Sequence, residues 1–317
     1  MTTLVTGATG FLGSHVMAAL GPEAHGFDIA PPGPDARTTA PGIADRISLG
    51  QITDSARLFD VLRAHPADTV VHTAGLVGLD LSLSQPATTY QTNLMGFVNV
   101  CEAARQTGVR RLVLVSSNAA YHAPTGPRLT ETDPVFSIER GNPAGHYGTS
   151  KMMQEAVAMA YATCHGLDVF VLRVTAIYGF GMRSPIYIKP MVEDAVAGRP
   201  TRFTHGGPMK RDYTYVLDAA TAVLAAMRAP QPGPHILNAS AGAAATASEV
   251  AAIVSAVIPG ADIEIGDTLT PLEAENVKMR APLDVSRAAA ILGWSPAWTL
   301  EAGIADYASR LRHAQAG

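Results

Sequence analysis

A glycine-rich stretch near the start of the chain gives the strongest indication of the fold. It reads Thr3-Leu4-Val5-Thr6-Gly7-Ala8-Thr9-Gly10-Phe11-Leu12-Gly13. Its apolar beginning predicts a short strand, and residues 11–20 have the spacing of a helix. The first glycine allows a tight turn, the second lets the backbone approach a pyrophosphate, and the third lets helix and strand pack closely. The helix N-terminus would present free N–H groups and a partial positive charge to the phosphates. The alternative is a plain strand-to-helix turn without a ligand. The residues expected at the phosphates are Gly7, Thr9, Gly10, Phe11, Leu12 and Gly13.

Apolar runs and helical stretches alternate through the first half of the chain. The expected strands after the first are residues 24–28, 46–49, 69–72, 111–115 and 168–174. The expected helices between them include residues 55–64, 86–107 and 144–165. Continuous apolar strands separated by helices predict a parallel sheet covered on both faces, which is the doubly wound α/β (Rossmann) architecture.

The character of the sequence changes beyond residue 178, where prolines interrupt shorter elements. Helical patches remain at residues 216–227, 248–257, 285–292 and 300–311. We therefore expect residues 1–178 to form the dinucleotide-binding domain with the catalytic residues. Residues 179–317 would mainly form a smaller C-terminal α/β lobe that binds substrate, with some segments returning to the first domain. Residues 31–41, rich in proline, glycine and threonine, are expected to form a surface loop.

Length and composition exclude several classes of protein. The chain has 317 residues, which suggests about two domains or one large α/β unit. A hydrophobic content of 47% provides for a sizeable core, and a net charge of −4 argues against a nucleic-acid partner. No apolar stretch is long enough for a membrane span, and no signal peptide precedes the first strand, so a cytoplasmic location is expected. Cys101 and Cys164 provide neither a disulfide framework nor a zinc site, and no metal is expected.

An acidic residue, Asp28, ends the second predicted strand, 21 positions after Gly7. A carboxylate at this position accepts hydrogen bonds from the adenosine ribose hydroxyls and repels a 2′-phosphate, which favours NAD over NADP. The alternative is a solvated aspartate in a turn. Arg37, on the following segment, leaves some tolerance of NADP open.

Tyr147 and Lys151 lie four positions apart at a predicted helix start, so they share one face. A phenol is a poor base at neutral pH, and a neighbouring ammonium lowers its pKa. The pair Ser116-Ser117 ends an apolar parallel strand, where side chains face the ligand crevice, so a serine there can hold the substrate oxygen that Tyr147 deprotonates. The alternative is a surface helix with a lysine available for an ion pair.

Taken together, these motifs resemble those of the extended short-chain dehydrogenases/reductases, the group that includes the NAD-dependent sugar epimerases and dehydratases. The resemblance covers nearly the whole chain. Its residues are 6–13, His72-Thr73-Ala74-Gly75, Asn93, Ser116-Ser117, Tyr147 to Lys151, Leu172-Arg173, Ile177-Tyr178-Gly179, 211–216 and Leu292-Gly293-Trp294-Ser295-Pro296.

The resemblance implies a role for each matching residue. Tyr147 would be the general acid/base, and Lys151 would lower its pKa and bind the nicotinamide ribose. Ser117 would orient the substrate hydroxyl, and Asn93 would support the proton relay, although it could instead bond to backbone within its helix. The remaining residues implied at the cofactor are Gln51, Ile52, Thr73, Ala74, Gly75, Val115 and Ile177. Gln51 and Gly75 depart from the usual aspartate and alanine of the family. The residues implied at the substrate are Ser117, Asn118, Tyr147, Arg183 and Arg211.

The chemistry that the resemblance implies is hydride transfer between a secondary alcohol of a sugar-type substrate and NAD. The 4,6-dehydratases of the family carry an Asp-Glu pair after the catalytic hydroxyl, where this chain has Asn118 and Ala119, so 4,6-dehydration is rejected. An epimerase of a nucleotide sugar of the UDP-hexose type is favoured. The alternative is a dehydrogenase of a small sugar acid, hydroxy acid or polyol. A non-catalytic nucleotide-sensing module is a remote third reading, because the Tyr–Lys pair is present.

The substrate-binding residues leave the choice between epimerase and dehydrogenase open. Arg211-Asp212-Tyr213 resembles the element whose arginine binds the diphosphate in nucleotide-sugar enzymes, although Asp212 could instead pair with Arg211 structurally. Ala176 stands where those enzymes commonly have asparagine. Their second phosphate-binding arginine has no clear counterpart, since Arg280 is close but out of step.

The resemblance also implies a homodimer with a four-helix interface. The candidate helices are residues 86–107 and 144–165, because both are long and apolar on more than one side.

Overall fold

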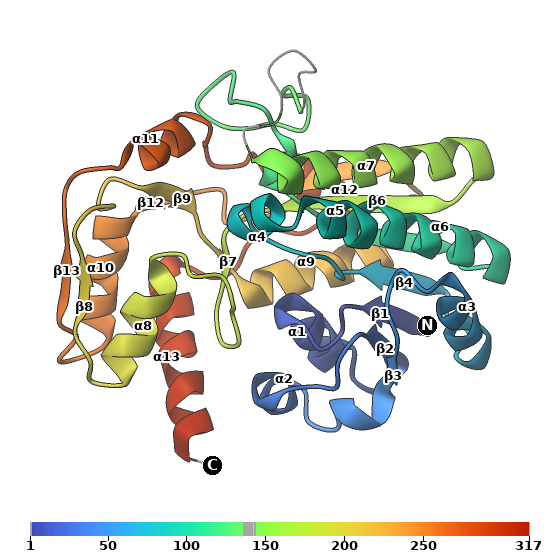
Figure 1. Ribbon diagram of the computed structural model, residues 1–317, viewed down its shortest axis with the longest axis horizontal. Helices are drawn as coiled ribbons and strands as arrows, with labels where there is room; N and C mark the ends of the chain where they lie inside the picture. The colour runs from blue at the N-terminus through green and yellow to red at the C-terminus, as the bar shows by residue number, and fades with distance from the viewer. Residues whose placement is uncertain (1, 136–141, 143, 317) are drawn as a thin grey trace.

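A parallel sheet forms the centre of the molecule (Figure 1). In the computed structural model, which describes residues 2–135, 142 and 144–316, the sheet contains seven strands in the order β11-β6-β5-β4-β1-β2-β3. Their bounds are β1 Thr3–Thr6, β2 Ala24–Asp28, β3 Ile47–Leu49, β4 Thr69–His72, β5 Arg111–Ser117, β6 Asp168–Val174 and β11 His235–Asn238. Every pairing between them is parallel. The strand order reverses next to β1, where the glycine turn lies, and ligands of doubly wound sheets bind at such switch points.

Helices cover both faces of this sheet, as the continuous apolar strands require. On one face, α1 (Phe11–Leu20) and α9 (Val216–Arg228) pack against residues such as Val5 and Val113. On the other, α3 (Ser55–Ala64), α6 (Gly96–Thr107) and α7 (Gly145–His165) pack against residues such as Leu4 and Leu112. Because successive strand residues point to opposite faces, one short apolar strand supplies two cores. The predicted doubly wound α/β architecture is confirmed.

A second group of elements lies to the left in Figure 1 and carries the other half of the candidate site. Its strands form three pairs: β7 (Ile177–Tyr178) with β10 (Thr214–Tyr215), β9 (Lys210–Asp212) with β12 (Ala244–Thr246), and β8 (Thr201–Phe203) with β13 (Ile263–Ile265). Its helices are α8 (Ile188–Val196), α10 (Ala247–Val257), α11 (Pro271–Lys278) and α13 (Leu300–Ala316). Between these segments the chain returns to the central sheet through α9, β11 and α12 (Ser286–Leu292).

Two segments differ from the sequence-based expectation. Residues 31–41 are not all loop, because Pro34–Thr39 forms the short helix α2 with Pro34 at its start and Ala36 buried against the core. The helical stretch 86–107 consists of α5 (Pro86–Thr89), the π-helix η3 (Tyr90–Met95) and α6, preceded by α4 (Leu79–Ser84). The remaining short helices are η1 (Gly21–Glu23), η2 (Ile43–Arg46) and η4 (Asn118–Ala120).

No helix in the described part of the chain is long and apolar enough to cross a membrane. The cytoplasmic location expected from the sequence stays a prediction.

Candidate active site

The glycine turn between β1 and α1 is built on contacts that leave no space for a Cβ atom. Gly7 has a φ of +73°, and a Cβ at Gly7 would stand 2.6 Å from the backbone nitrogen of Ala74. A Cβ at Gly13 would stand 2.0 Å from the carbonyl oxygen of Gly7, which is too close for any other residue. Thr73 fixes the turn from β4, because its hydroxyl donates to the carbonyl oxygens of Thr6 (2.8 Å) and Gly7 (3.2 Å). This bare backbone cradle at a helix N-terminus fits the pyrophosphate of a dinucleotide.

Asp28 lies beside this turn, at the carboxyl end of β2. Its carboxylate accepts hydrogen bonds from the backbone nitrogens of Thr9 (2.8 Å) and Ile29 (2.7 Å). The carboxylate is therefore at the rim of the cradle and partly exposed, as a ribose-binding group needs to be. Arg37, considered for a 2′-phosphate, donates instead to the backbone carbonyl of Pro32 at 2.9 Å.

The other residues predicted to line the cofactor lie around the same edge of the sheet. Phe11 is partly exposed, whereas Leu12 is buried in the core beneath it. Gln51 is exposed, and Ile52 is buried against Gly96.

Gly75 and Ile177 are two further residues predicted to lie at the cofactor. A Cβ at Gly75 would stand 3.0 Å from Oδ1 of Asn93, so glycine at this departure from the family pattern relieves a tight contact. Ile177 lies in β7, where it pairs with Thr214 of the second group of elements.

Tyr147, Ser117 and Lys151 come together where α7 crosses the end of β5. The hydroxyl of Ser117 is close enough to the phenol of Tyr147 to favour its ionised form. Nζ of Lys151 donates to the backbone carbonyl of Val115 at 3.0 Å, and only 5% of the lysine is exposed. The structure thus brings together three residues that the sequence separates by up to 34 positions.

Burial dominates the electrostatics of this cluster. It raises the pKa of Tyr147, and Ser117 acts in the opposite direction. Burial lowers the pKa of Lys151 to about 8, while the charge of Glu155 raises it. The ammonium of Lys151 donates to the carbonyl of Val115, and its effect on the pKa of Tyr147 stays a prediction.

Asn93 is fully buried in the π-helix η3, and its side chain is occupied by local hydrogen bonds. Oδ1 accepts from the backbone nitrogen of Leu76 (2.7 Å), and Nδ2 donates to the carbonyl of Leu76 (3.0 Å) and to Oγ of Ser150 (3.0 Å). Its own carbonyl, freed from the regular helix pattern, accepts from Nε2 of Gln154 at 2.7 Å. These contacts favour the alternative in which Asn93 holds backbone and the start of α7 in place.

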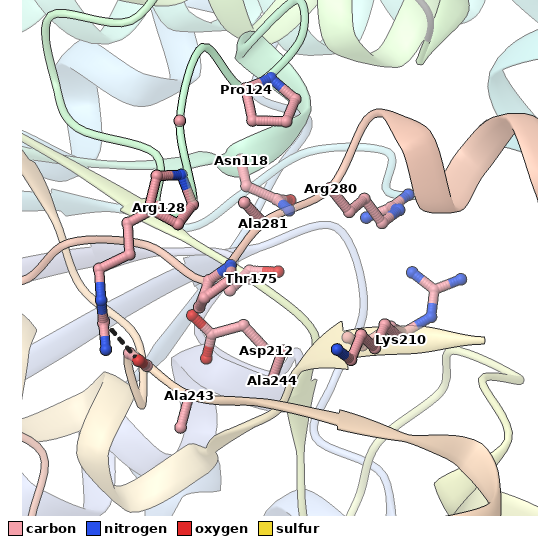
Figure 2. A pocket seen from close by; sticks show the side chains of 15 residues that line it. Asn118, Pro124, Arg128, Thr175, Lys210, Asp212, Ala243, Ala244, Arg280 and Ala281 are labelled. Atoms are coloured by element: carbon pink, nitrogen blue, oxygen red, sulfur yellow. Dashed lines mark hydrogen bonds between the residues drawn. The ribbon is translucent and has the colours of Figure 1, made fainter. Parts of the chain in front are cut away.

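A cavity of about 460 Å³ lies between Asn118, at the end of β5, and the strands β9 and β12 of the second group of elements (Figure 2). It is lined by Asn118, Pro124, Gly126, Pro127, Arg128, Thr175, Lys210, Arg211, Asp212, Gly242, Ala243, Ala244, Arg280, Ala281 and Pro282. Asn118 directly follows Ser117, so the cavity and the Tyr147 cluster share one wall. Its ionisable side chains are mostly cationic, which predicts an anionic ligand.

Arg211 and Arg280 are the central cations of this cavity. The Nε atom of each is buried and has no hydrogen-bond partner among the described residues. Burial lowers the pKa of both guanidiniums, and the charge of Arg211 contributes to lowering the pKa of Arg280 to about 9. Two half-buried like charges that repel each other form a site that an anion would stabilise.

Asp212 does not pair with Arg211, although the sequence allowed that reading. Its Oδ2 accepts from Oγ of Ser240 (2.7 Å) and from the backbone nitrogen of Leu283 (3.0 Å). Burial raises its pKa to about 6. The carboxylate therefore ties β9 to the segment that carries Arg280, and the guanidinium of Arg211 stays available.

The substrate residues predicted from sequence need two corrections. Arg183 is exposed and does not line the cavity. Arg280, considered out of step, does line it together with Lys210 and Arg128, as Figure 2 shows. Asn118 is in the lining as expected, and Thr175, next to the departure at Ala176, was missed. The position of Arg280 depends on the path of α11, which spacing along the sequence does not reveal.

The turn, the Ser–Tyr–Lys cluster and the cationic cavity define the class of the protein, an enzyme of the extended short-chain dehydrogenase/reductase type. A family model described as the NAD dependent epimerase/dehydratase family matches residues 3–240, and the chain belongs to this family. The enzyme is therefore NAD-dependent.

Similar proteins of known name match this chain along most of their length. The chain is 28% identical over 316 residues to a UDP-glucose 4-epimerase of Mycolicibacterium smegmatis, covering 96% of each protein. It is 31% identical to a UDP-glucose 4-epimerase of Azospirillum brasilense, covering 78% of this chain and 74% of the relative. Among solved structures, the Thermus thermophilus UDP-glucose 4-epimerase in complex with NAD matches with a TM-score of 0.81 and 27% identity, over 98% of this chain and 99% of that one.

His72, at the end of β4, predicts an acid-sensitive step in stability. It is fully buried between Oγ1 of Thr6 (2.8 Å) and Nε2 of Gln154 (3.5 Å), and burial lowers its pKa to about 3. A folded-state pKa below the unfolded value near 6.5 means that stability is full above pH 6.5 and is lost as the pH falls towards 3. We expect wild type to lose about 2 kcal/mol more between pH 7 and pH 5 than His72→Gln.

Urea unfolding at the two pH values measures this difference, with His313→Gln, at an exposed site, as control. Equal pH slopes for wild type and His72→Gln would contradict the assignment of a buried neutral imidazole.

Proposed function

We propose that this enzyme is a nucleotide-sugar 4-epimerase whose substrate is a UDP-hexose. The observation that carries the proposal is the pair Arg211 and Arg280 in a cavity that shares a wall with the Ser117–Tyr147 cluster. A planar guanidinium binds phosphate through two parallel hydrogen bonds, so two such groups suit a diphosphate. A small hydroxy acid or polyol would leave at least one of these buried charges uncompensated.

The proton chemistry is assigned to the residues at the end of β5. Tyr147 would take the proton of the sugar hydroxyl, and Ser117, which acts on the phenol, would hold the same oxygen. Lys151 would stabilise the phenolate and bind the nicotinamide ribose. NAD, when bound, accepts the hydride from the sugar carbon and returns it. Because the cavity leaves the sugar ring tethered by its diphosphate, the ketone could present its other face before the hydride returns.

The cofactor site is assigned to the cradle described above. The backbone of Gly7, Gly10 and Gly13 would hold the pyrophosphate, and Asp28 would bind the adenosine ribose hydroxyls, with NAD preferred over NADP. Support comes from the Cβ-free approach of Gly13 to Gly7 and from the position of Asp28 next to Thr9.

Several relatives support the epimerase over the dehydrogenase and the non-catalytic module. Besides the two UDP-glucose 4-epimerases, they include a UDP-glucuronate 4-epimerase of Arabidopsis thaliana, 26% identical over 97% of this chain and 75% of that protein. The presence of both the half-buried Tyr147 and the buried Lys151 speaks against a module without chemistry.

The first prediction from the proposed function concerns the reaction. Purified enzyme with NAD should convert UDP-glucose into its 4-epimer without net NADH release, followed by NMR of the sugar and absorbance of NADH. Tyr147→Phe should lower turnover by about 10²–10⁴-fold, because the general acid/base is removed. Tyr161→Phe, on the outer part of the same helix, is the matched control and should stay active.

Stoichiometric NADH accumulation with a small hydroxy acid or polyol would favour the dehydrogenase instead. Near-full activity of Tyr147→Phe would remove that residue from the mechanism.

The second prediction concerns the diphosphate. Arg211→Met and Arg280→Met should each weaken UDP binding by roughly ten- to a hundredfold, because a hydrogen bond to a charged group contributes about 1.5–3 kcal/mol. Arg183→Met, at an exposed site outside the cavity, should bind like wild type. Isothermal calorimetry with UDP measures the change, and NAD affinity should stay constant. A wild-type protein that binds neither UDP nor UDP-sugars would exclude the nucleotide-sugar substrate.

We also propose that the enzyme is a homodimer that associates through α6 and α7. In Figure 1, α4, α5 and α6 lie along α7, and Leu83 and Met95 in this region are exposed apolar side chains. Covering such residues is a common reason for association. Light scattering at micromolar concentration should give twice the chain mass, and a monomer mass would refute the dimer.

A further inference from the structure

Three consecutive residues at the end of β5 each contact a residue on one face of α7. Val115 accepts from Lys151, Ser117 contacts Tyr147, and between them Oγ of Ser116 donates to Oε1 of Glu155 at 2.5 Å. On α7, these partners stand at successive four-residue intervals, so they form one stripe along the helix. Glu155 is thus the third residue of the stripe that carries the catalytic pair, although no role has so far been given to it.

A second strand fixes the same carboxylate. Arg173 of β6 is the register partner of Ser116, and it binds Glu155 with two nitrogens. Nε lies 3.0 Å from Oε1 and the terminal nitrogen Nη2 lies 2.6 Å from Oε2. The side chains are only 3% and 5% exposed, so water does not screen the pair. This fork geometry holds the carboxylate in one orientation.

The guanidinium of Arg173 also packs against an aromatic ring. Its guanidinium carbon lies 4.4 Å from the ring centroid of Tyr121, whose hydroxyl donates to Oδ1 of Asn238 at 2.7 Å. Nδ2 of Asn238 donates to the carbonyls of Leu129 (2.9 Å) and Asp284 (3.1 Å). Residues 128 and 282, close to these two carbonyls, line the substrate cavity. The ion pair is therefore connected, through Tyr121 and Asn238, to the segments that line the cavity.

Stability alone does not account for such a pair. Taking two charges out of water costs several kcal/mol per ion, and replacing a buried ion pair by apolar residues is often neutral or stabilising. A functional reason for keeping this ion pair lies one helical turn away, at Lys151. Lys151 is 5% exposed, its direct partner is a neutral carbonyl, and the carboxylate that raises its pKa is Glu155.

We propose that Glu155 is a positioning residue for proton transfer, whose carboxylate, locked by Ser116 and Arg173, keeps the buried Lys151 protonated and aligned beside Tyr147. The proposal rests on the assignment of Lys151 to the proposed reaction.

Four other groups lie around Lys151 in the described part of the chain, and none of them supplies a negative charge. From α7, Tyr147 is neutral at the start of the cycle because burial raises its pKa. From β4, His72 is neutral above its low pKa and adds no negative charge. From β5, Val115 contributes a carbonyl dipole. Arg173 of β6 is paired with Glu155, and of these two charges Glu155 is the one that acts on the pKa of Lys151.

The chain offers a direct readout, because its lysines are Lys151, Lys189, Lys210 and Lys278. Labelling them with ¹³C at Cε gives few resonances, and Lys151→Arg assigns the one of interest. The Cε shift followed against pH then reports the protonation of Lys151 without substrate. Wild type should titrate with a midpoint near 8.

Glu155→Gln should lower the Lys151 midpoint by about one pH unit or more, since an opposite charge has been removed from a buried ammonium. The alkaline limb of the pH–kcat profile should move down by the same amount, while KM for the UDP-sugar stays within about twofold. Glu301→Gln, on the exposed first turn of α13, should leave both midpoints unchanged. A residue with a merely structural role would change stability but not the lysine titration.

Glu155→Gln leaves Arg173 buried without its partner and can fail to fold. The double variant Glu155→Gln, Arg173→Gln removes both charges, and its Lys151 midpoint is predicted to shift in the same direction by a smaller amount. An unmoved Lys151 midpoint in a folded variant would overturn the inference, even if epimerisation is observed. A shifted midpoint in a protein that turns over no UDP-hexose would instead support the role of Glu155 in charging Lys151 and overturn the proposed substrate.

Discussion

The contact between the end of β5 and one face of α7 is the interaction on which the site depends. At this contact, three successive residues of β5 supply a carbonyl and two hydroxyls. The helix α7 supplies a partner at every fourth residue, because such residues lie on one face of a helix. The same strand end continues into Asn118, which lines the cationic cavity. One contact thus joins the residues proposed for the proton chemistry to the cavity proposed for the substrate.

Sequence reasoning succeeds where a feature is local. The glycine turn, the limits of α3 and the start of α7 depend on neighbouring residues, so their patterns are sufficient. It fails where distant packing decides. The helix α2 depends on the burial of Ala36, and the π-helix around Asn93 depends on hydrogen bonds to Leu76 and Gln154. These contacts join segments that no short window of sequence connects.

The candidate site shows the same division. Tyr147, Ser117 and Lys151 follow from spacing and strand position, but the partner of Lys151 does not. Arg280 was set aside because the count of residues around it differs from the family pattern, whereas the fold brings it into the cavity with Arg211. Burial changes the chemistry of every one of these groups, and burial is a property of the assembled structure.

The π-helix at residues 90–95 also marks a place where the length of this chain can change. A π-turn holds about one residue more than an α-turn but completes the same rotation. Deleting a single residue there would convert the wide turn into a regular α-turn and leave the buried face of α6, with Phe97 and Cys101, directed at the sheet. The loss would instead fall on Asn93, whose carbonyl accepts from Gln154 within the wide turn.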